Sequence, residues 1–321
     1  MTDVVVQARG GDSIGTVPGT GFPIATTIRD ALYDRIPLSE PELALVSTPV
    51  FLRLDRIQQL GFVSRVWPGA KHARYDHSLG VLHLTRLAVA HLRSTSGGAW
   101  IGDEDARVIA AAALLHDIGH YPFSHAIEEL GPPIVPHETV GARIIEGPEI
   151  APILRDAWRI DPARVAAIVD PRGRDLPPSD RVLRGVLSGP LDMDKLDYLP
   201  RDARACNVPY GGVDSARLID ALRIVEPAAD GPSARRVAIG GKGVSPLHSL
   251  INARQEMFDN VYWHHTNRAC MAMLLRAVQD ALVERAIGPA ELTGLDDASL
   301  LAALADPAMP PSTRRLTGAL R

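Results

Sequence analysis

The stretch LLHDIGHYPFSHAIE, residues 114–128, joins the end of an apolar helix to a run of histidines and carboxylates. His116 and His120 stand four residues apart, so they would share one face of a continuous helix. Gly119 and Pro122, however, interrupt the helical pattern at this point. We therefore predict a turn between two helices.

Two more functional side chains follow the turn. His125 and Glu128 are three residues apart and should lie on one face of the second helix. A kinked helix pair can direct a His-Asp dipeptide, two further histidines and a carboxylate into one pocket. Histidine is a common metal ligand and general acid or base, and eight of the eleven histidines lie between His72 and His137. The stretch therefore predicts a metal site or a catalytic site.

The segment HARYDHSLGVLHL, residues 72–84, adds two candidates. The periodic apolar pattern that follows predicts a helix over residues 79–92, after a loop over residues 62–76. His77 directly precedes this helix, where its side chain could reach into a helical bundle. Arg74 lies three residues earlier and could meet an anion.

The segment LDMDKLDYLPRD, residues 191–202, carries a third group of candidates. Asp194, Tyr198 and Asp202 recur every four residues, so they should line one face of a helix. Asp192 falls off that face. If one aspartate binds a metal, helical geometry favours Asp194 over Asp192.

Helical signals dominate the rest of the chain. A capping box at residues 39–42 starts one helix, and Thr48 restarts another that Gly61 is placed to end. A short strand is expected near residues 24–27 and a hairpin at residues 222–226 and 235–239. We predict an all-α fold, a mostly helical bundle with a minor short β-hairpin. Further helices are expected over residues 104–117, 124–130, 137–146, 149–159, 161–169, 181–188, 190–203, 215–223 and 246–287, with one or two more after residue 288.

Composition bounds the class of protein. The 321 residues are 46% hydrophobic and 22% charged, as in a folded globular protein. We expect a flexible tail over residues 1–24, a catalytic domain over residues 25–287 and a short C-terminal helical extension over residues 288–321. No signal peptide or membrane-spanning run is evident, and two distant cysteines are typical of a reduced, cytoplasmic protein. A net charge of −4 gives no reason to expect strong nucleic-acid binding.

Six ordered segments resemble the HD superfamily of metal-dependent phosphohydrolases. Within it, the match is to the deoxynucleoside triphosphate triphosphohydrolases related to a mammalian enzyme with SAM and HD domains. The resemblance covers roughly residues 30–285 and implies an HD-domain helical bundle. The matching segments are TPVFLRLDRIQQLG, WPGAKHARYDHSLGVLHL, LLHDIGHYPFSHAIE, PHE, LDMDKLDYLPRDARACNVPYGGVD and FDNVYWHHTNRAC.

The resemblance implies a metal site and a set of catalytic groups. The implied reaction is attack of water on the α-phosphorus of a deoxynucleoside triphosphate (dNTP), which releases the deoxynucleoside and intact triphosphate. Two imidazoles and two carboxylates suit Mn²⁺, Fe²⁺ or Zn²⁺, or Mg²⁺ as a harder alternative, and a second Mg²⁺ could arrive with the triphosphate. The implied metal ligands are His77, His116, Asp117 and Asp194. The implied catalytic residues are His120, His125, Glu128 and His137, and whether His120 or His137 protonates the leaving oxygen stays open.

The resemblance also implies a substrate shell of eight residues. Arg74, Lys195 and Arg254 would hold phosphate oxygens. Asp202 and Gln59 would recognise the 3′-hydroxyl of the sugar, while Tyr198 would exclude ribonucleotides. The full implied set is Gln59, Leu60, Arg74, Lys195, Tyr198, Asp202, Arg254 and Tyr262.

Departures from the family concern regulation and base choice. Ser47, Leu52 and Asp55, with Thr26, stand where the mammalian relative reads an activating guanine nucleotide. We therefore expect that regulatory site to be absent. We also expect the chain to lack the C-terminal lobe that helps larger relatives assemble. Because the groups that read the nucleotide are gone, an oligomer is possible but a nucleotide-induced tetramer is not expected. In the base-pocket region, Trp263 and His265 replace polar or basic residues of relatives, so the base preference stays open and dGTP is a first guess as substrate.

Two other readings remain. The chain could be a different HD phosphohydrolase that acts on nucleoside monophosphates, cyclic nucleotides or another phosphate ester. It could also be a nucleotide-binding sensor without turnover. The set of metal ligands and acid–base residues disfavours a sensor. Detection of triphosphate as a product would distinguish the dNTP triphosphohydrolase, with a role in dNTP catabolism, from both alternatives.

Overall fold

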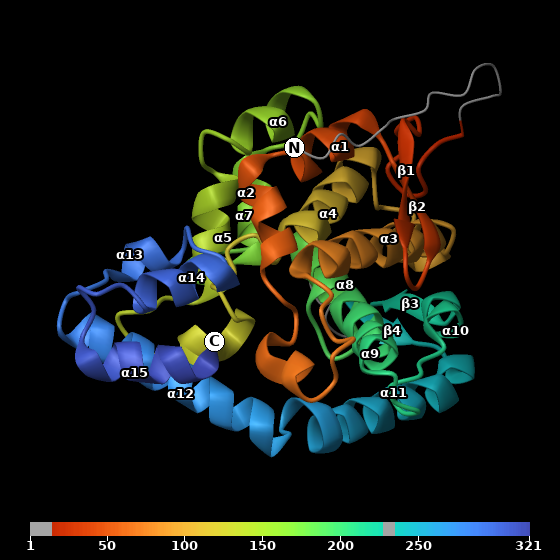
Figure 1. The fold of residues 1–321 in the computed structure, drawn as a ribbon. Coiled ribbons are helices and arrows are strands. Elements are labelled where there is room, and N and C mark those ends of the chain that lie inside the picture. The colour runs from red at the N-terminus through yellow and green to blue at the C-terminus, as the bar shows by residue number, and fades with distance from the viewer. Residues whose placement is uncertain (1–14, 227–234) are drawn as a thin grey trace.

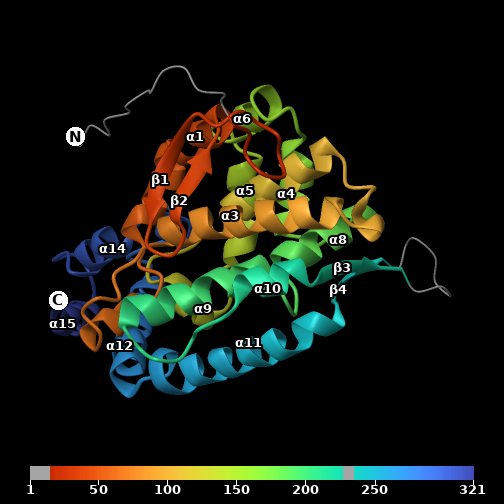
Figure 2. The ribbon, with the colours of Figure 1, turned by 90° about the vertical axis from the view of Figure 1, so that its right-hand side faces the viewer.

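A computed structural model describes residues 15–226 and 235–321 of the chain. Helices make up most of these residues, and the strands form two small antiparallel pairs, β1–β2 and β3–β4. The predicted all-α fold with a short hairpin is therefore confirmed, and it has one more hairpin than expected (Figure 1, Figure 2). Among the described residues, every helix is too short or too polar to cross a bilayer.

Two helices, α3 (Arg74–Arg93) and α4 (Asp103–Leu115), pack together at the centre of the bundle. In α4, the run from Ala110 to Leu115 is buried throughout, and its small alanines let neighbouring helices approach closely. The helix begins where Asp105 Oδ2 accepts a hydrogen bond from the Gly102 amide, at 2.9 Å. It ends one residue before His116, so the His-Asp dipeptide lies on the turn that leaves the core.

The other helices wrap this centre, and α11 and α12 run along one side of it (Figure 1). Besides α3 and α4, the α-helices as far as α12 are α1 (Glu40–Val46), α2 (Pro49–Leu52), α5 (His137–Ile145), α6 (Ala151–Asp156), α7 (Pro162–Val169), α8 (Pro178–Leu187), α9 (Met193–Cys206), α10 (Ser215–Asp220), α11 (Val244–Met257) and α12 (His265–Val283). The capping box predicted for α1 is present, since Ser39 accepts a hydrogen bond from the Glu42 amide. The predicted β3 (Leu222–Val225) and β4 (Arg236–Ile239) pair as expected.

The start of α3 differs from the prediction. Helix α3 begins at Arg74 rather than near residue 79, so His77 lies within the helix and not before it. The Asp76 carboxylate accepts a hydrogen bond from the Ala73 amide at 2.9 Å and caps the helix from inside. Because the alanine at the N-cap position, Ala73, has no side chain that can cap a helix, the sequence gives no clear signal that α3 begins at Arg74.

The long helix predicted over residues 246–287 is wrong as a single element. It is divided into α11, a π-helical turn at Phe258–Tyr262, and α12. The side-chain amide of Asn267 donates a hydrogen bond to the Tyr262 carbonyl at 3.0 Å, and His264 Nδ1 accepts one from the backbone amide of Thr266 at 3.3 Å. These side chains satisfy backbone groups at the break, which is how a helix interruption is normally stabilised. The segment predicted as a helix after Thr48 is likewise only α2 followed by a 3₁₀ turn at Arg53–Arg56.

The N-terminal region is more ordered than predicted where it is described. Strands β1 (Thr26–Asp30) and β2 (Asp34–Leu38) form a hairpin, where the sequence indicated only one short strand. Val17 is buried, and Thr16 pairs with Pro23 in an isolated bridge. The expected loose tail does not hold for residues 15–24. Residues 1–14 of that tail lie outside the described residues.

The C-terminal helices pack against the core rather than extending from it. They are α13 (Pro289–Leu292), α14 (Asp297–Leu304) and α15 (Pro311–Leu320), and α15 lies along α12. The buried Arg53 guanidinium donates to Leu295 O at 2.9 Å and to Ile118 O and His120 O at 3.0 and 2.9 Å. The buried Asp297 accepts hydrogen bonds from the Gln58 and Phe123 amides. These contacts tie α14 to the loops beside the His-Asp dipeptide.

Gly119 provides the tightest backbone contact next to that dipeptide. A Cβ atom there would overlap the carbonyl oxygen of His137 and the amide nitrogen of Gly141, both in α5. The obstructing atoms are backbone, so no side-chain rotation could relieve the clash. Gly119 therefore lets the loop lie directly against the first turn of α5.

We predict that Gly119→Ala lowers the free energy of unfolding by about 3 kcal/mol or more, because α5 must move away from the loop. Gly212→Ala is the matched control, since a Cβ there meets no atom within 4 Å. It should change stability by less than about 0.5 kcal/mol. Urea unfolding followed by circular dichroism measures both. Equal stability of the two variants would contradict the packing described for Gly119.

Candidate active site

Three side chains from separate elements converge behind the His-Asp turn. His77 comes from α3, His116 directly follows α4, and Asp194 lies in the first turn of α9. One ligand atom of each lies within 4.8 Å of the others. His77 Nε2 is 3.0 Å from Asp194 Oδ1, and His116 Nε2 is 4.0 Å from the same oxygen. Asp192 instead caps α9 by accepting from the Lys195 amide, which agrees with the preference for Asp194.

Asp117, the fourth predicted metal ligand, lies beside these three. Its Oδ1 is 3.3 Å from His116 Nε2, and its Oδ2 is 3.8 Å from His77 Nε2. Arg74 Nη1 donates a hydrogen bond to the same Oδ2. Burial opposes ionisation of Asp117, but Arg74 and the neighbouring histidines outweigh it and hold the pKa of this carboxyl well below its usual range. Asp117 is therefore an anion shared between Arg74 and the cluster.

The donor set fits a divalent cation. His116 Nδ1 lies 2.7 Å from the Ala113 carbonyl, while its buried Nε2 has no hydrogen-bond partner among the described residues. An imidazole fixed through one nitrogen with the other free is the usual arrangement of a metal-binding histidine. Burial lowers the pKa of His77, yet Asp194 and Asp197 raise it to about 10 overall. The cluster therefore attracts positive charge, and two imidazoles with carboxylates suit a transition metal or Mg²⁺.

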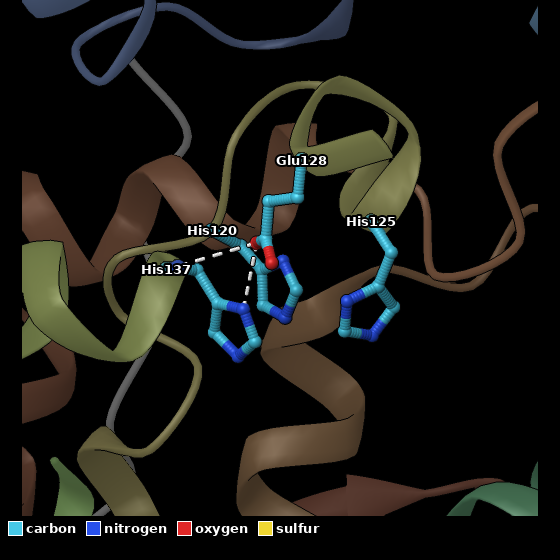
Figure 3. Close-up of side chains that lie close together, drawn as sticks. All are labelled: His120, His125, Glu128 and His137. Carbon is cyan, nitrogen blue, oxygen red and sulfur yellow. Dashed lines mark hydrogen bonds and ion pairs between the residues drawn. The ribbon is translucent and has the colours of Figure 1, made fainter. Parts of the chain in front are cut away.

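The four predicted catalytic residues form a second cluster (Figure 3). His120 follows the His-Asp turn, His125 and Glu128 lie on the 3₁₀ turn Ser124–Leu130, and His137 begins α5. One polar atom of each lies within 4.8 Å of the others. Glu128 Oε1 is 2.7 Å from His137 Nδ1, and the His120 and His137 rings stack with centroids 3.8 Å apart. The cluster thus contains a carboxylate–histidine pair with a second imidazole against its face.

A strained turn positions His125. Phe123 and Ser124, which precede it, have φ angles of 57° and 60°, in the left-handed region that non-glycine residues seldom occupy. The turn is held on two sides, because Arg74 Nε donates to Ser124 Oγ at 2.9 Å and Asp297 accepts from the Phe123 amide at 2.6 Å. Arg74 therefore contacts both clusters, through Asp117 and through Ser124.

Neighbouring charges shift the pKa values of the three histidines in this cluster in different directions. Burial and the nearby Arg74 lower the pKa of His120 well below its ordinary value. The pKa of the more exposed His125 is lowered as well, by desolvation and by Arg74. Burial also opposes charge on His137, but the hydrogen bond and negative charge of Glu128 outweigh burial and raise the pKa of His137. His137 is therefore the histidine of this cluster that holds a proton most readily, while His120 and His125 are neutral.

Two adjoining cavities open beside the clusters. The larger has a volume of about 480 Å³ and the smaller about 230 Å³. Both are lined by Arg74, His125 and Asp194, so they meet at the candidate metal site. All eight predicted substrate-binding residues line the larger cavity: Gln59, Leu60, Arg74, Lys195, Tyr198, Asp202, Arg254 and Tyr262. The structure thus brings this set together, and the role of each residue stays a prediction.

Besides Arg74, three of these residues have internal partners: Asp202, Tyr262 and Lys195. Asp202 Oδ1 lies 2.7 Å from His72 Nε2, and its Oδ2 accepts from the Tyr262 hydroxyl at 2.7 Å. The Lys195 ammonium donates to Asp192 Oδ2 at 2.7 Å and to the Gly189 carbonyl. A substrate would therefore share or replace these bonds.

Sequence reasoning missed several residues at the site. Arg184 of α8 lines the smaller cavity, and within the part of the chain that the structure describes its buried Nε has no hydrogen-bond partner. Its segment carried no motif, so nothing in the sequence marked it. Asp197 contacts His77 Nδ1 at 2.8 Å, and its position three residues after Asp194 was an available signal. The residues at the expected missing regulatory site, Ser47, Leu52 and Asp55, are exposed and line neither cavity.

Comparison with known proteins agrees with this geometry. Residues 74–199 match the family model of the HD domain, and residues 213–317 match that of the HD associated region. The chain is therefore an HD-domain protein, with an HD associated region following the domain.

Among its relatives are deoxynucleoside triphosphate triphosphohydrolases. SAMHD1 of Gallus gallus is 26% identical over 285 residues, which cover 80% of this chain and 46% of that protein. SAMHD1 of Homo sapiens is 26% identical over 279 residues, with 78% and 44% covered.

Other relatives have no assigned function. An uncharacterized protein of Methanocaldococcus jannaschii is 31% identical over 280 residues, which cover 86% of this chain and 54% of that protein. A crystal structure of a hypothetical protein from Aquifex aeolicus superposes with a TM-score of 0.75 at 28% identity, covering 92% of this chain and 74% of that one. The chain spans about half the length of the curated relatives it matches.

We predict that Glu128→Gln lowers the pKa of His137, because the variant loses the carboxylate charge that raises it. The raised pKa also means that protonation of His137 contributes stability that is present below its unfolded pKa of about 6.5 and is lost as pH rises through its folded pKa. Because the pKa of Glu128 is lowered by the same pair, the pair is lost again in acid, as pH falls through the folded pKa of Glu128. NMR titration of the histidine rings measures the shift. Glu146→Gln, which breaks an exposed pair with Arg174, is the control. An unchanged His137 titration in Glu128→Gln would contradict the assignment.

Proposed function

We propose that the chain is a metal-dependent dNTP triphosphohydrolase, which converts a dNTP and water to a deoxynucleoside and triphosphate. One observation carries the proposal. The metal-ligand cluster and the His137–Glu128 pair adjoin a single cavity system, lined by all eight residues that the family resemblance assigns to dNTP binding. The SAMHD1 relatives, named as enzymes of this class, support it further.

The metal-binding residues of the proposal are His77, His116, Asp117 and Asp194. The ion is Mn²⁺, Fe²⁺, Zn²⁺ or Mg²⁺, and a second Mg²⁺ can enter with the triphosphate. When bound, such an ion neutralises phosphate charge and lowers the pKa of water. Asp117 stays ionised beside Arg74, so the site keeps its negative charge at neutral pH.

The chain's own residues supply binding and proton transfer. Arg74, Lys195 and Arg254 hold phosphate oxygens, which arginine can do through two donors. As water adds to the α-phosphorus, the bond from phosphorus to the 5′ oxygen breaks and that oxygen needs a proton. His137 is the better acid of the two candidates, because Glu128 orients it at Nδ1 and raises its pKa, while the stacked His120 is held neutral.

The proposal includes constitutive activity. The Leu52 side chain has no hydrogen-bonding group for a guanine edge. The exposed Asp55 carries negative charge at a position where, by the family resemblance, a nucleotide would need positive charge. An effector acts only through differential binding to two states of the protein. Without side chains that recognise guanine and triphosphate, GTP would not bind one state of the protein more tightly than another, and it would not activate the enzyme.

We predict that purified protein releases inorganic triphosphate from dNTPs and that Asp117→Ala abolishes both release and metal retention. Mass spectrometry identifies the product, and elemental analysis measures the metal. Asp175→Asn, with a side chain 97% exposed, is the matched control and should behave as wild type. Assays with and without GTP test constitutive activity. Release of pyrophosphate or phosphate instead, or full activity and metal content in Asp117→Ala, would contradict the proposal, and stimulation by GTP would contradict its constitutive part.

We predict that dGTP is hydrolysed in preference to GTP, because Tyr198 lies one turn after Asp194 and lines the cavity where it can abut C2′ of the sugar. Tyr198→Ala should reduce the ratio of the two kcat/KM values by about tenfold, the effect of losing about 1.4 kcal/mol of discrimination. Tyr210→Ala, outside both cavities, is the control. Equal turnover of GTP and dGTP by wild-type protein would contradict the prediction that Tyr198 excludes ribonucleotides.

A further inference from the structure

A buried hydrogen-bond network lies on the side of His77 away from the cavity. Its centre is Asp197, which is completely buried. Asp197 Oδ2 is 2.8 Å from His77 Nδ1 and accepts from Arg201 Nε at 2.8 Å. Asp197 Oδ1 accepts from the Tyr33 hydroxyl at 2.8 Å and from Arg201 Nη2 at 2.9 Å. Both carboxylate oxygens therefore have two partners, and their positions are tightly determined.

The network continues into the β1–β2 hairpin. Arg201 Nη1 donates to Asp30 Oδ2 at 2.8 Å, in a pair that is also buried. Asp30 Oδ1 in turn accepts from the Leu32 and Tyr33 amides of the hairpin turn, at 2.7 and 3.0 Å. A continuous chain of hydrogen bonds thus runs from the turn of the hairpin to the ring of His77.

Gly80 is an independent sign that the carboxylate occupies a reserved position. This glycine lies inside α3, where glycine is intrinsically unfavourable. A Cβ atom there would overlap Asp197 Oδ1 and approach the Arg201 guanidinium. The helix therefore leaves room for the Asp197 carboxylate one turn beyond His77.

The geometry indicates which nitrogen of His77 faces the candidate metal ligands. Asp197 is held as an anion by Arg201, so it accepts the proton on Nδ1 of His77. The other nitrogen, Nε2, then faces Asp194 at 3.0 Å and Asp117 at 3.8 Å. A carboxylate behind a histidine fixes the tautomer and the ring orientation that a metal requires.

We propose that Asp197 is a positioning residue of the metal centre, and that the β1–β2 hairpin, acting through Tyr33, Asp30 and Arg201, sets how tightly the ion is held. This rests on the metal site of the proposed function. The competing explanation is that the network only attaches the hairpin to α3 and α9. The two differ in one measurable quantity, the affinity of the folded protein for metal.

The test is titration of metal-free protein with Mn²⁺ alone, with free Mn²⁺ measured by electron paramagnetic resonance. Asp197→Asn keeps the shape of the side chain and removes its charge, and we expect Mn²⁺ to bind about 10- to 100-fold more weakly. Glu42→Gln is the matched control. It removes the charge from another buried carboxylate, which pairs with Arg86 on the same helix α3 at 2.8 Å, and it should bind Mn²⁺ as wild type does.

A second, milder variant guards against loss of folding in Asp197→Asn. Tyr33→Phe deletes one hydrogen bond to Asp197 Oδ1 and leaves its ion pair with Arg201 intact. We expect a smaller but measurable loss of Mn²⁺ affinity, about twofold to tenfold, at unchanged circular dichroism. Tyr75→Phe, whose ring packs on Phe51, removes a hydroxyl without touching Asp197 and should have no effect.

Folded Asp197→Asn and Tyr33→Phe proteins that bind Mn²⁺ as tightly as wild type would overturn the positioning role and leave the proposed hydrolase intact. Loss of affinity in both, with the two controls unchanged, supports it. Two other results would show that the metal site of the proposed function is itself wrong. In the first, wild-type protein binds no Mn²⁺; in the second, the Asp117→Ala variant binds Mn²⁺ as tightly as wild type. Either result would also overturn this inference. The wild-type titration therefore separates the two failures.

Discussion

The backbone contact between Gly119 and the first turn of α5 is the constraint on which the two clusters depend. The His-Asp dipeptide leaves α4 on one side of this contact, and His137 enters α5 on the other. Because no side chain separates the two backbones, the ring of His120 can stack on that of His137. With a longer separation, the candidate metal-ligand cluster and the candidate acid–base cluster would no longer adjoin the same cavity.

Within this frame, opposite charges give similar residues different tasks. His77 stands between Asp194 and Asp197, so its surroundings favour a cation. His120 and His125 lie near Arg74, which together with burial keeps them neutral, and Glu128 restores basicity to His137 alone. These four histidines thus differ in basicity because His77 and His137 face carboxylates whereas His120 and His125 face Arg74, which takes part in both clusters.

The sequence was most informative where the signal is local. Periodicity and capping predicted the helical bundle, the β3–β4 hairpin and the turn at Gly119, and the four-residue spacing of Asp194, Tyr198 and Asp202 agrees with their common cavity. It failed where a partner lies far along the chain. The β1–β2 turn is held by Arg201, 171 residues after Asp30, and the break after α11 depends on side-chain bonds to the backbone. Arg184 reaches the smaller cavity from a segment with no motif, and only the packing of α8 against α9 reveals it.

Because α14 and the turn at Arg53 contact the loops of the HD segment, this segment cannot be separated from the rest of the chain without losing hydrogen bonds. Residues 74–199 match the HD-domain model, yet the carbonyls of Ile118 and His120 are satisfied by Arg53, and the Phe123 amide by Asp297. Both partners lie outside that span. Transplanting residues 74–199 into another protein would carry every candidate metal ligand but leave three backbone groups beside them without partners. Evolution by exchange of whole domains would therefore have to move the flanking helices together with the HD segment.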